Sequence, residues 1–201
     1  MLTSNGISAL AIDTLCRQSP LKNTVILCHY CDYQVQKEQS AVNIIGSLFR
    51  QVNWKLPVIQ SEIRRVFNES KKRSGKSLQL TDMIQLFVQA ISSIRRAYIC
   101  VDAVDVLLPE DRSELLRALQ RIIQEAPNAR LFLTTRPHIR PEFVKHFAKE
   151  GCVIDLVADQ GDIASYVSIK IEYSKHQCPG PVTENLKDDI MKIVPGQALG
   201  T

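Results

Sequence analysis

The chain has 201 residues, of which 45% are hydrophobic and 23% are charged, and its formal net charge is +4. This balance is typical of a soluble globular protein. No apolar run approaches the roughly 20 residues that a membrane-spanning helix needs, and the N-terminal residues lack the basic and apolar regions of a secretory signal, so we expect a cytoplasmic location.

Helical and strand patterns alternate along the first part of the chain. This interpretation rests on hydrophobic periodicity, on runs of β-branched residues and on helix-breaking residues such as Pro57. The predicted elements are a helix at Gly6–Arg17, a strand at Thr24–Tyr30, a helix at Ser40–Val52 with Ser40 as N-cap, and helices at Val58–Ser70 and Leu80–Arg95.

A basic segment, Lys71–Lys76, separates the last two of these helices. Its end, Gly75-Lys76-Ser77, matches the end of the phosphate-binding loop pattern G-x-x-x-x-G-K-[ST]. Ser70 stands where the first glycine belongs, and no buried strand precedes the segment. We therefore reject it as a phosphate-binding loop and favour a solvated loop.

An apolar run that ends in an acid is the most informative pattern of the chain. Residues 97–105 read AYICVDAVD, so the run ends at Asp102 and Asp105 follows it. Such a run suits a strand buried in a parallel sheet, and open α/β sheets bind ligands at the carboxyl ends of their strands. An acid there suits magnesium bound to a nucleotide. An ordinary strand with solvated aspartates explains the run equally well.

The next predicted strand also ends in polar residues. It reads RLFLTTRP at Arg130–Pro137 and follows a predicted helix at Pro109–Glu125. At its end, Arg136 would reach a terminal phosphate as a charge-assisted donor. This order of elements predicts an α/β fold with a doubly wound, mostly parallel sheet.

The remaining patterns are less specific. They predict a short strand at Cys152–Leu156, helices at Asp162–Tyr173 and Thr183–Val194, and a joint at Cys178–Pro181. The six cysteines are scattered, as in a reducing compartment. Cys28 and Cys31 form a lone C-x-x-C on a predicted strand, where their sulfurs would point to opposite faces, so a zinc site is not predicted.

Several motifs, in this order, resemble a NACHT domain of the signal-transduction P-loop NTPases. The closest resemblance is to the nephrocystin-like NACHT modules of fungal signalling proteins, and it covers nearly the whole chain. The motifs are CDY at 31–33, AVNIIGSLFRQ at 41–51, YICVDAVD at 98–105, LFLTTRPH at 131–138 and DIASY at 162–166.

The resemblance implies a P-loop NTPase that uses Mg²⁺ with ATP or GTP and switches between nucleotide states. It implies that Asp102 is the magnesium-holding acid, that Asp105 is a catalytic acid, and that Arg136 contacts the terminal phosphate. It also implies protein partners through an effector domain and ankyrin, WD or TPR repeats, and a homo-oligomer of the full-length protein. No membrane or nucleic-acid partner is implied.

The chain departs from the family pattern at three points. The phosphate-binding loop and the strand before it, expected ahead of the helix at Gly6–Arg17, are missing, which should leave open edges on the flanking strands. Val106 stands where the family has another acid. We therefore expect the chain to be truncated at both ends. Residues 1–177 should form an NTPase core without its first strand, and residues 178–201 should begin a helical module.

These departures shape the expected function. Phosphoryl transfer depends on positioning and electrostatic stabilisation, so the loss of the phosphate cradle should remove most of both binding and rate. We expect a fragment of a NACHT-type signalling NTPase that, alone, binds nucleotide weakly or not at all and does not hydrolyse it. The alternatives are a nucleotide-independent protein-interaction module, a decayed gene fragment, and, least favoured, a nucleic-acid binder that uses Lys71–Lys76.

Overall fold

The structure, a computed structural model, describes residues 4–18, 23–55, 65, 79–147, 151–156, 159–177 and 183–197. These residues group into two compact units, Ser4–Gly151 and the residues from Cys152 onward. Apart from Arg65, the predicted helix at Val58–Ser70 lies outside the described residues, as do the basic segment and the joint at residues 178–181. The predicted boundary between residues 177 and 178 stays a prediction.

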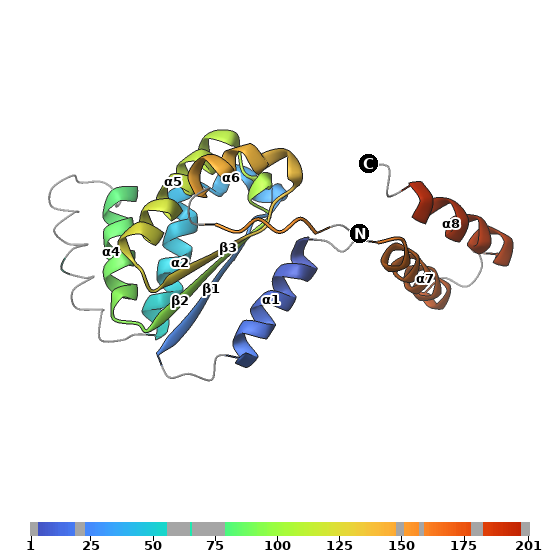
Figure 1. Cartoon of the computed structure of the whole chain (residues 1–201), viewed down its shortest axis with the longest axis horizontal. Helices are drawn as coiled ribbons and strands as arrows, with labels where there is room; N and C mark the ends of the chain where they lie inside the picture. The colour runs from blue at the N-terminus through green and yellow to red at the C-terminus, as the bar shows by residue number, and fades with distance from the viewer. Residues whose placement is uncertain are drawn as a thin grey trace. The chain divides into compact units, whose positions relative to one another are not determined.

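Helices and strands alternate in the first unit (Figure 1). The elements are α1 (Ser4–Gln18), β1 (Thr24–Tyr30), α2 (Ala41–Lys55), α4 (Leu80–Ser92), β2 (Arg96–Asp102), α5 (Pro109–Glu125), β3 (Ala129–Leu133) and α6 (Arg140–Phe147), with short 3-10 helices η1 (Tyr33–Glu38), η3 (Val104–Val106) and η4 (Pro137–Ile139). Of the α-helices and strands, only α6 was not predicted. It is short and has no buried residue, so it carries no clear apolar stripe.

The strands form the predicted parallel sheet. The sheet has three strands in the order β1-β2-β3, and both strand pairs are parallel. Tyr30 lies opposite Asp102, and Val101 lies opposite Leu133, so the three strands end at the same edge of the sheet. The loops that follow β2 and β3, which carry the predicted site residues, therefore lie next to each other.

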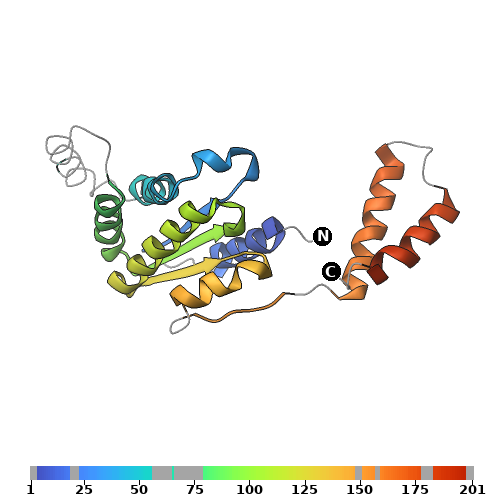
Figure 2. The same ribbon diagram turned by 90° about the horizontal axis from the view of Figure 1, so that it is seen from above.

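Helices cover both faces of this sheet (Figures 1 and 2). On one face, α2, α4 and α5 pack against one another, and α2 and α5 also pack against β1 and β3, respectively, whereas α1 packs against β1 and β2. Phe49 of α2 meets Phe87 of α4 edge to face, with ring centroids 6.5 Å apart. The predicted N-cap Ser40 is confirmed, because its hydroxyl accepts a hydrogen bond from the Asn43 N–H at 3.3 Å. The largest fully buried side chains are Leu27, Ile44, Ile45, Leu48, Phe87, Ile91, Ile99, Leu107, Leu115, Leu116, Leu119 and Ile122.

The two outer strands, β1 and β3, differ in what contacts the edge that faces away from β2. The side-chain amide of Gln51, on α2, accepts from the Cys28 N–H at 2.9 Å and donates to the Cys28 carbonyl at 2.8 Å. Gln51 thus occupies backbone groups that a further strand would use. Along β3, no described strand pairs on the side away from β2. Among the described residues, this edge of β3 therefore has no strand partner.

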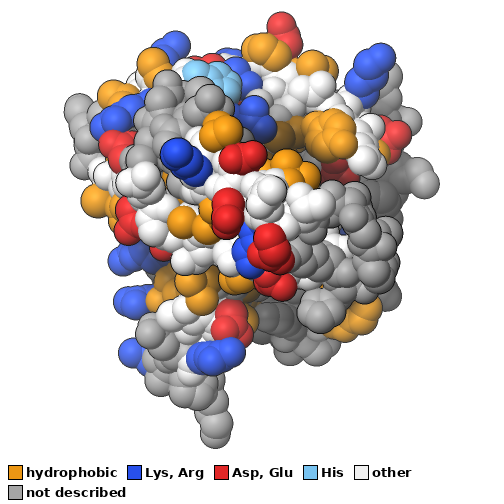
Figure 3. Space-filling view, turned by 90° about the vertical axis from the view of Figure 1, so that its right-hand side faces the viewer, with side chains coloured by type: hydrophobic (Ala, Val, Ile, Leu, Met, Phe, Trp, Pro, Cys, Tyr) orange, Lys and Arg blue, Asp and Glu red, His pale blue; other side chains and the backbone are white. Residues whose placement is uncertain are grey.

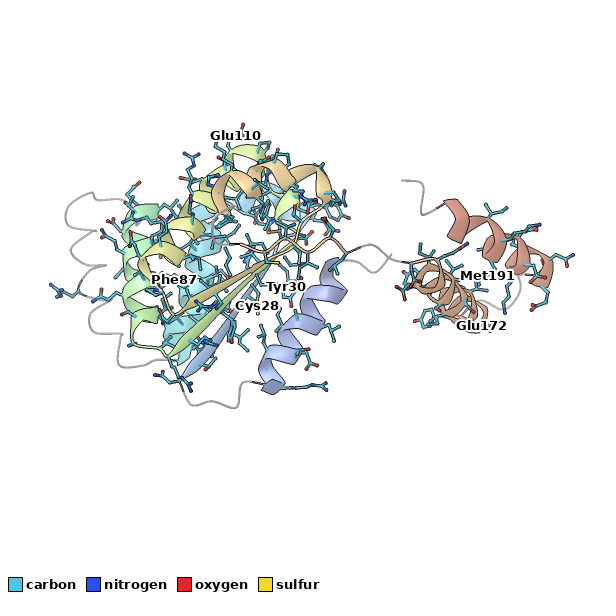
Figure 4. The ribbon with its side chains drawn as sticks, in the orientation of Figure 1. Cys28, Tyr30, Phe87, Glu110, Glu172 and Met191 are labelled. Carbon is cyan, nitrogen blue, oxygen red and sulfur yellow. The ribbon has the colours of Figure 1, made fainter. Side chains whose placement is uncertain are left out.

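The second unit contains the two helices α7 (Gln160–Gln177) and α8 (Glu184–Gln197). Lys187 of α8 forms an ion pair with Glu172 of α7 at 2.8 Å (Figure 4). The strand predicted at Cys152–Leu156 is wrong: residues 151–156 are exposed and have no regular secondary structure. A short apolar run becomes a strand only where a neighbour supplies its hydrogen bonds, and no described strand does so here.

Hydrophobic side chains are also exposed on the surface, where they are mixed with acidic and basic ones (Figure 3). Leu156, Ile169, Tyr173 and Ile193 are among the exposed hydrophobic residues. No helix in the described part of the chain is long and apolar enough to cross a membrane.

Candidate functional site

The carboxylate of Asp102 lies at the carboxyl end of β2, the central strand, and is almost fully buried, with 3% of the residue exposed. Its Oδ1 accepts hydrogen bonds from the hydroxyl of Ser8, on α1, and from the hydroxyl of Thr134, at 2.5 Å. Its Oδ2 is buried and has no hydrogen-bond partner among the described residues. One oxygen of this carboxylate is thus satisfied, and the other is left for a group outside the described chain.

The backbone just after Asp102 is held in an unusual conformation. Ala103 has a φ of 55°, in the left-handed region that non-glycine residues rarely adopt. Its N–H donates to the Thr134 hydroxyl at 2.9 Å, and the Val104 N–H donates to the Thr134 carbonyl at 3.0 Å. Thr134 therefore both stabilises this turn and orients the Asp102 carboxylate. Backbone strain of this kind is concentrated at functional sites.

Asp105 and Arg136, two residues singled out from the sequence, form a pair. The Arg136 N–H donates to Asp105 Oδ1 at 3.2 Å, and the Arg136 Nε lies 3.4 Å from Oδ2. The Asp105 side chain is 7% exposed, whereas that of Arg136 is 77% exposed. Each Asp105 oxygen therefore has a cationic or N–H partner, and the Arg136 guanidinium extends into solvent at the edge of the sheet.

Thiols and a phenol near Asp102 are poorly suited to act as nucleophiles. Burial raises the pKa of the Cys31 thiol to about 12, and burial also raises the pKa of Tyr30 (Figure 4). Cys28 and Cys100 are partners across the β1–β2 pair, and a hydrogen bond from the Cys100 thiol to Cys28, together with burial, raises the pKa of Cys100. The thiols of Cys31 and Cys100 therefore stay protonated at neutral pH.

Ser8 is a site residue that the sequence reasoning missed. Its signal is the tripeptide Gly6-Ile7-Ser8, which has the glycine and the serine of the phosphate-binding loop pattern but Ile7 where that pattern has lysine. Met1 stands at the position of the first glycine. Because two of the four defining positions are changed, the match becomes visible only once Ser8 is seen next to Asp102.

The oxygen atoms around Asp102 are suitable ligands for a magnesium ion. Mg²⁺ prefers oxygen ligands and commonly binds proteins through one or two carboxylates together with phosphate oxygens and water. Oδ2 of Asp102 is a buried carboxylate oxygen without a partner among the described residues, and the Ser8 hydroxyl lies beside the same group. The donor set is therefore suitable for Mg²⁺, whereas a hydrophobic Ile7 cannot supply the positive charge that a phosphate needs.

The fold and this arrangement define the class of protein, an α/β domain related to the P-loop NTPases and similar to NACHT domains. Among solved structures, the chain is similar to the Orc1 protein of Aeropyrum pernix, solved in complex with DNA, with a TM-score of 0.54 and 14% sequence identity. The match covers 84% of this chain but 40% of the Orc1 chain.

A family model also matches the sequence. The model, described as "Nephrocystin 3, N-terminal", matches residues 6–136. The chain therefore belongs to the nephrocystin 3 N-terminal family, as its motifs indicated. A comparison with curated proteins found no match.

Proposed function

We propose that this chain is part of a NACHT-type signalling NTPase that has kept the magnesium side of its nucleotide site and lost much of the phosphate side. The observation that carries the proposal is the Asp102 carboxylate, whose buried Oδ2 has no partner among the described residues. The family membership and the P-loop NTPase fold support a nucleotide as the ligand. As an isolated chain, it binds nucleotide weakly and does not hydrolyse it.

Each residue has a distinct role in this proposal. Asp102 and Ser8 hold Mg²⁺, which, when bound, neutralises charge on the phosphate oxygens. Arg136 faces the terminal phosphate, because its guanidinium is exposed beside the strand tip. Asp105 holds Arg136 in place rather than acting as a free base, because both of its oxygens already contact Arg136.

The absence of a positive charge at Ile7 explains the weak binding. In the loop pattern, the lysine reaches the β- and γ-phosphates and backbone N–H groups cradle them. One exposed arginine cannot replace this cradle, because interactions between exposed charges are weakened by water and salt. Hydrolysis depends on the same electrostatic stabilisation and is lost with it.

The test is an equilibrium titration with fluorescent analogues of ATP and GTP, with and without Mg²⁺, on the wild type and on Asp102→Ala. We expect a dissociation constant well above the micromolar range and any residual binding to require Mg²⁺ and Asp102. Micromolar binding that Asp102→Ala abolishes would show that the phosphate side is intact and overturn the proposed defect. Binding that neither Mg²⁺ nor Asp102→Ala affects would remove Asp102 from the site.

A variant tests the explanation for the defect directly. Ile7→Lys restores the residue type of the loop pattern at that position, and we expect it to tighten Mg²⁺-dependent binding about tenfold or more. Ile7→Gln is the matched control, since it has a polar chain without charge. Equal effects of the two substitutions would mean that charge at position 7 is not what the site lacks.

A nucleotide-independent protein-interaction module is the second candidate. Exposed apolar side chains on α7 and α8, including Ile169, Tyr173 and Ile193, favour it. No binding of either nucleotide analogue at any Mg²⁺ concentration, in a folded wild-type chain, would leave this as the better explanation. In either case we propose protein partners, supplied by further modules of a longer protein, and a cytoplasmic location.

A further inference from the structure

A second ion pair connects α5 and α6, the two helices that follow the candidate site residues. Arg112, in the first turn of α5, is 6% exposed and holds Glu142, in α6, through two parallel hydrogen bonds. Its Nε donates to Oε2 at 2.9 Å and its Nη2 donates to Oε1 at 2.8 Å. This bidentate geometry is the strong form of an arginine–carboxylate contact.

The same guanidinium also holds the loop after β2. The Arg112 Nη1 donates to the Leu107 carbonyl at 3.0 Å and lies 3.5 Å from the carbonyl of Asp105. Arg112 therefore joins the backbone that carries the Asp105 carboxylate to the helix that follows Arg136. The hydrogen bond from Arg112 lowers the pKa of Glu142, and the same bond raises the pKa of Arg112, so both groups stay charged at neutral pH.

The loops after β2 and β3 are thus tied together at three successive points. The first tie is Asp102 to Thr134, the second is Asp105 to Arg136, and the third is Arg112 to Glu142. The middle tie is the weakest by geometry, since its contacts are 3.2 and 3.4 Å long and Arg136 is exposed. An exposed pair of this kind keeps one geometry only when its backbone is held on both sides.

We propose that Arg112, acting through Glu142, is a positioning residue that fixes the Asp105–Arg136 pair and hence the direction in which the Arg136 guanidinium extends. Arg112 does not touch the ligand, because it is 6% exposed and each of its three side-chain nitrogens already donates to Glu142 or to a backbone carbonyl. The consequence for nucleotide recognition rests on the proposed function. The positioning itself concerns this chain alone.

Hydrogen exchange on the full chain tests the positioning without any nucleotide. Glu142→Gln keeps the size of the side chain but removes the charge that Arg112 grips. The matched control is Glu125→Gln: both glutamate side chains are 39% exposed, and Glu125 pairs with Arg121 at 2.6 Å within α5. A second variant, Arg112→Lys, keeps the positive charge but cannot hold two oxygens at once.

The readouts are two backbone amides with known acceptors. The Arg136 amide donates to Asp105, and the Ala103 amide donates to Thr134. In Glu142→Gln and Arg112→Lys, we expect exchange at Arg136 to rise about tenfold and exchange at Ala103 to change less than about twofold, while Glu125→Gln alters neither. Equal rises at both amides would indicate general loosening, and no rise at Arg136 would show that the ion pair does not position it; either result overturns the proposal.

Nucleotide preference tests the functional consequence. Fluorescent ATP and ADP analogues differ by the terminal phosphate, so their affinity ratio with Mg²⁺ reports on Arg136. We expect Glu142→Gln to reduce this ratio about threefold to tenfold and to leave ADP affinity unchanged. An unchanged ratio in a chain that binds both analogues overturns the link to Arg136. Absence of all nucleotide binding by the wild type is a failure of the proposed function, and the exchange result then decides the positioning.

Discussion

The two acids at and just after the end of β2, Asp102 and Asp105, lie close in sequence but in different surroundings. The Asp102 region, formed by Asp102, Ser8 and Thr134, is a buried carboxylate with two hydroxyl donors on one oxygen and none on the other. The Asp105 region, formed by Asp105 and Arg136, is a carboxylate matched on both oxygens by an exposed arginine. In the Asp102 region, one carboxylate oxygen has no hydrogen-bond partner among the described residues. In the Asp105 region, both carboxylate oxygens contact Arg136.

In the proposed function, this difference separates the region that binds the ligand from the one that does not. Leaving a buried charged oxygen without a hydrogen bond is unfavourable, and folded proteins keep such groups mainly where they serve a function. An ion pair that is complete within the chain gives no such indication. The two regions should therefore respond in opposite ways to substitution and to magnesium.

Removing the Thr134 hydroxyl should have the largest effect on stability. In Thr134→Val, Asp102 Oδ1 loses a donor and the Ala103 N–H loses its acceptor. We expect the free energy of unfolding to fall by about 2–4 kcal/mol in urea titrations. Thr135→Val is the control, because the Thr135 hydroxyl makes one long contact of 3.4 Å to the Arg136 carbonyl. Similar losses in both variants would contradict the special role of Thr134.

Neutralising Asp102 should stabilise the chain and abolish its response to magnesium. In Asp102→Asn, the side-chain oxygen can still accept from Ser8 and Thr134, while the buried charge is gone. We expect a gain of about 1–2 kcal/mol in Mg²⁺-free buffer. Thermal unfolding with and without MgCl₂ provides the measurement: the wild type should gain stability from Mg²⁺ and the variant should not. An identical Mg²⁺ response in both proteins would place the ion elsewhere.

Neutralising Asp105 should have a smaller effect that depends on salt. Its partner Arg136 is 77% exposed, so the attraction between the two charges is weakened by water. We expect Asp105→Asn to lower the free energy of unfolding by less than about 1 kcal/mol, with the difference decreasing as NaCl is added. Urea titrations at low and high salt measure this effect. A loss as large as that of Thr134→Val would mean that the Asp105–Arg136 pair contributes as much to stability as the buried contacts of Thr134.

The smallest effect concerns pH and the glutamate that supports the Asp105 region. Arg112 lowers the pKa of Glu142 from its ordinary value of 4.5, while His146 and His138 act in the same direction. Because the folded-state pKa is lower than the unfolded one, the pair adds stability above pH about 4.5, and this is lost as pH falls through the folded-state pKa. The stability difference between wild type and Glu142→Gln should therefore shrink in acid. A constant difference from pH 7 to pH 3 would rule out this titration.

The sequence was sufficient for much of this architecture because its signals are local. The apolar run before Asp102 predicts a buried strand, and the alternation with Pro109–Glu125 predicts a parallel neighbour, both of which the structure confirms. Even the family assignment follows from motifs that are contiguous in sequence. These features depend on periodicity and order, which a sequence displays directly.

The details of the site depend on contacts between distant residues. Ser8 and Asp102 are 94 residues apart, and Arg112 and Glu142 are 30 apart, so neither pair is visible as a motif. The pairing of Asp105 with Arg136 also joins residues 31 apart, and the catalytic role predicted for Asp105 stays a prediction. Apolar content alone also failed to predict the structure at Cys152–Leu156. A strand there would need the backbone of a neighbouring strand to complete its hydrogen bonds.

The amide of Gln51 has a consequence for self-association. Two copies of this chain could join through their β3 strands, and the resulting six-stranded sheet would end on both sides at a β1 strand whose Cys28 groups are already occupied. Fibril growth requires every added copy to offer a fresh edge. The side-chain amide of Gln51 therefore hinders the addition of a further strand at β1.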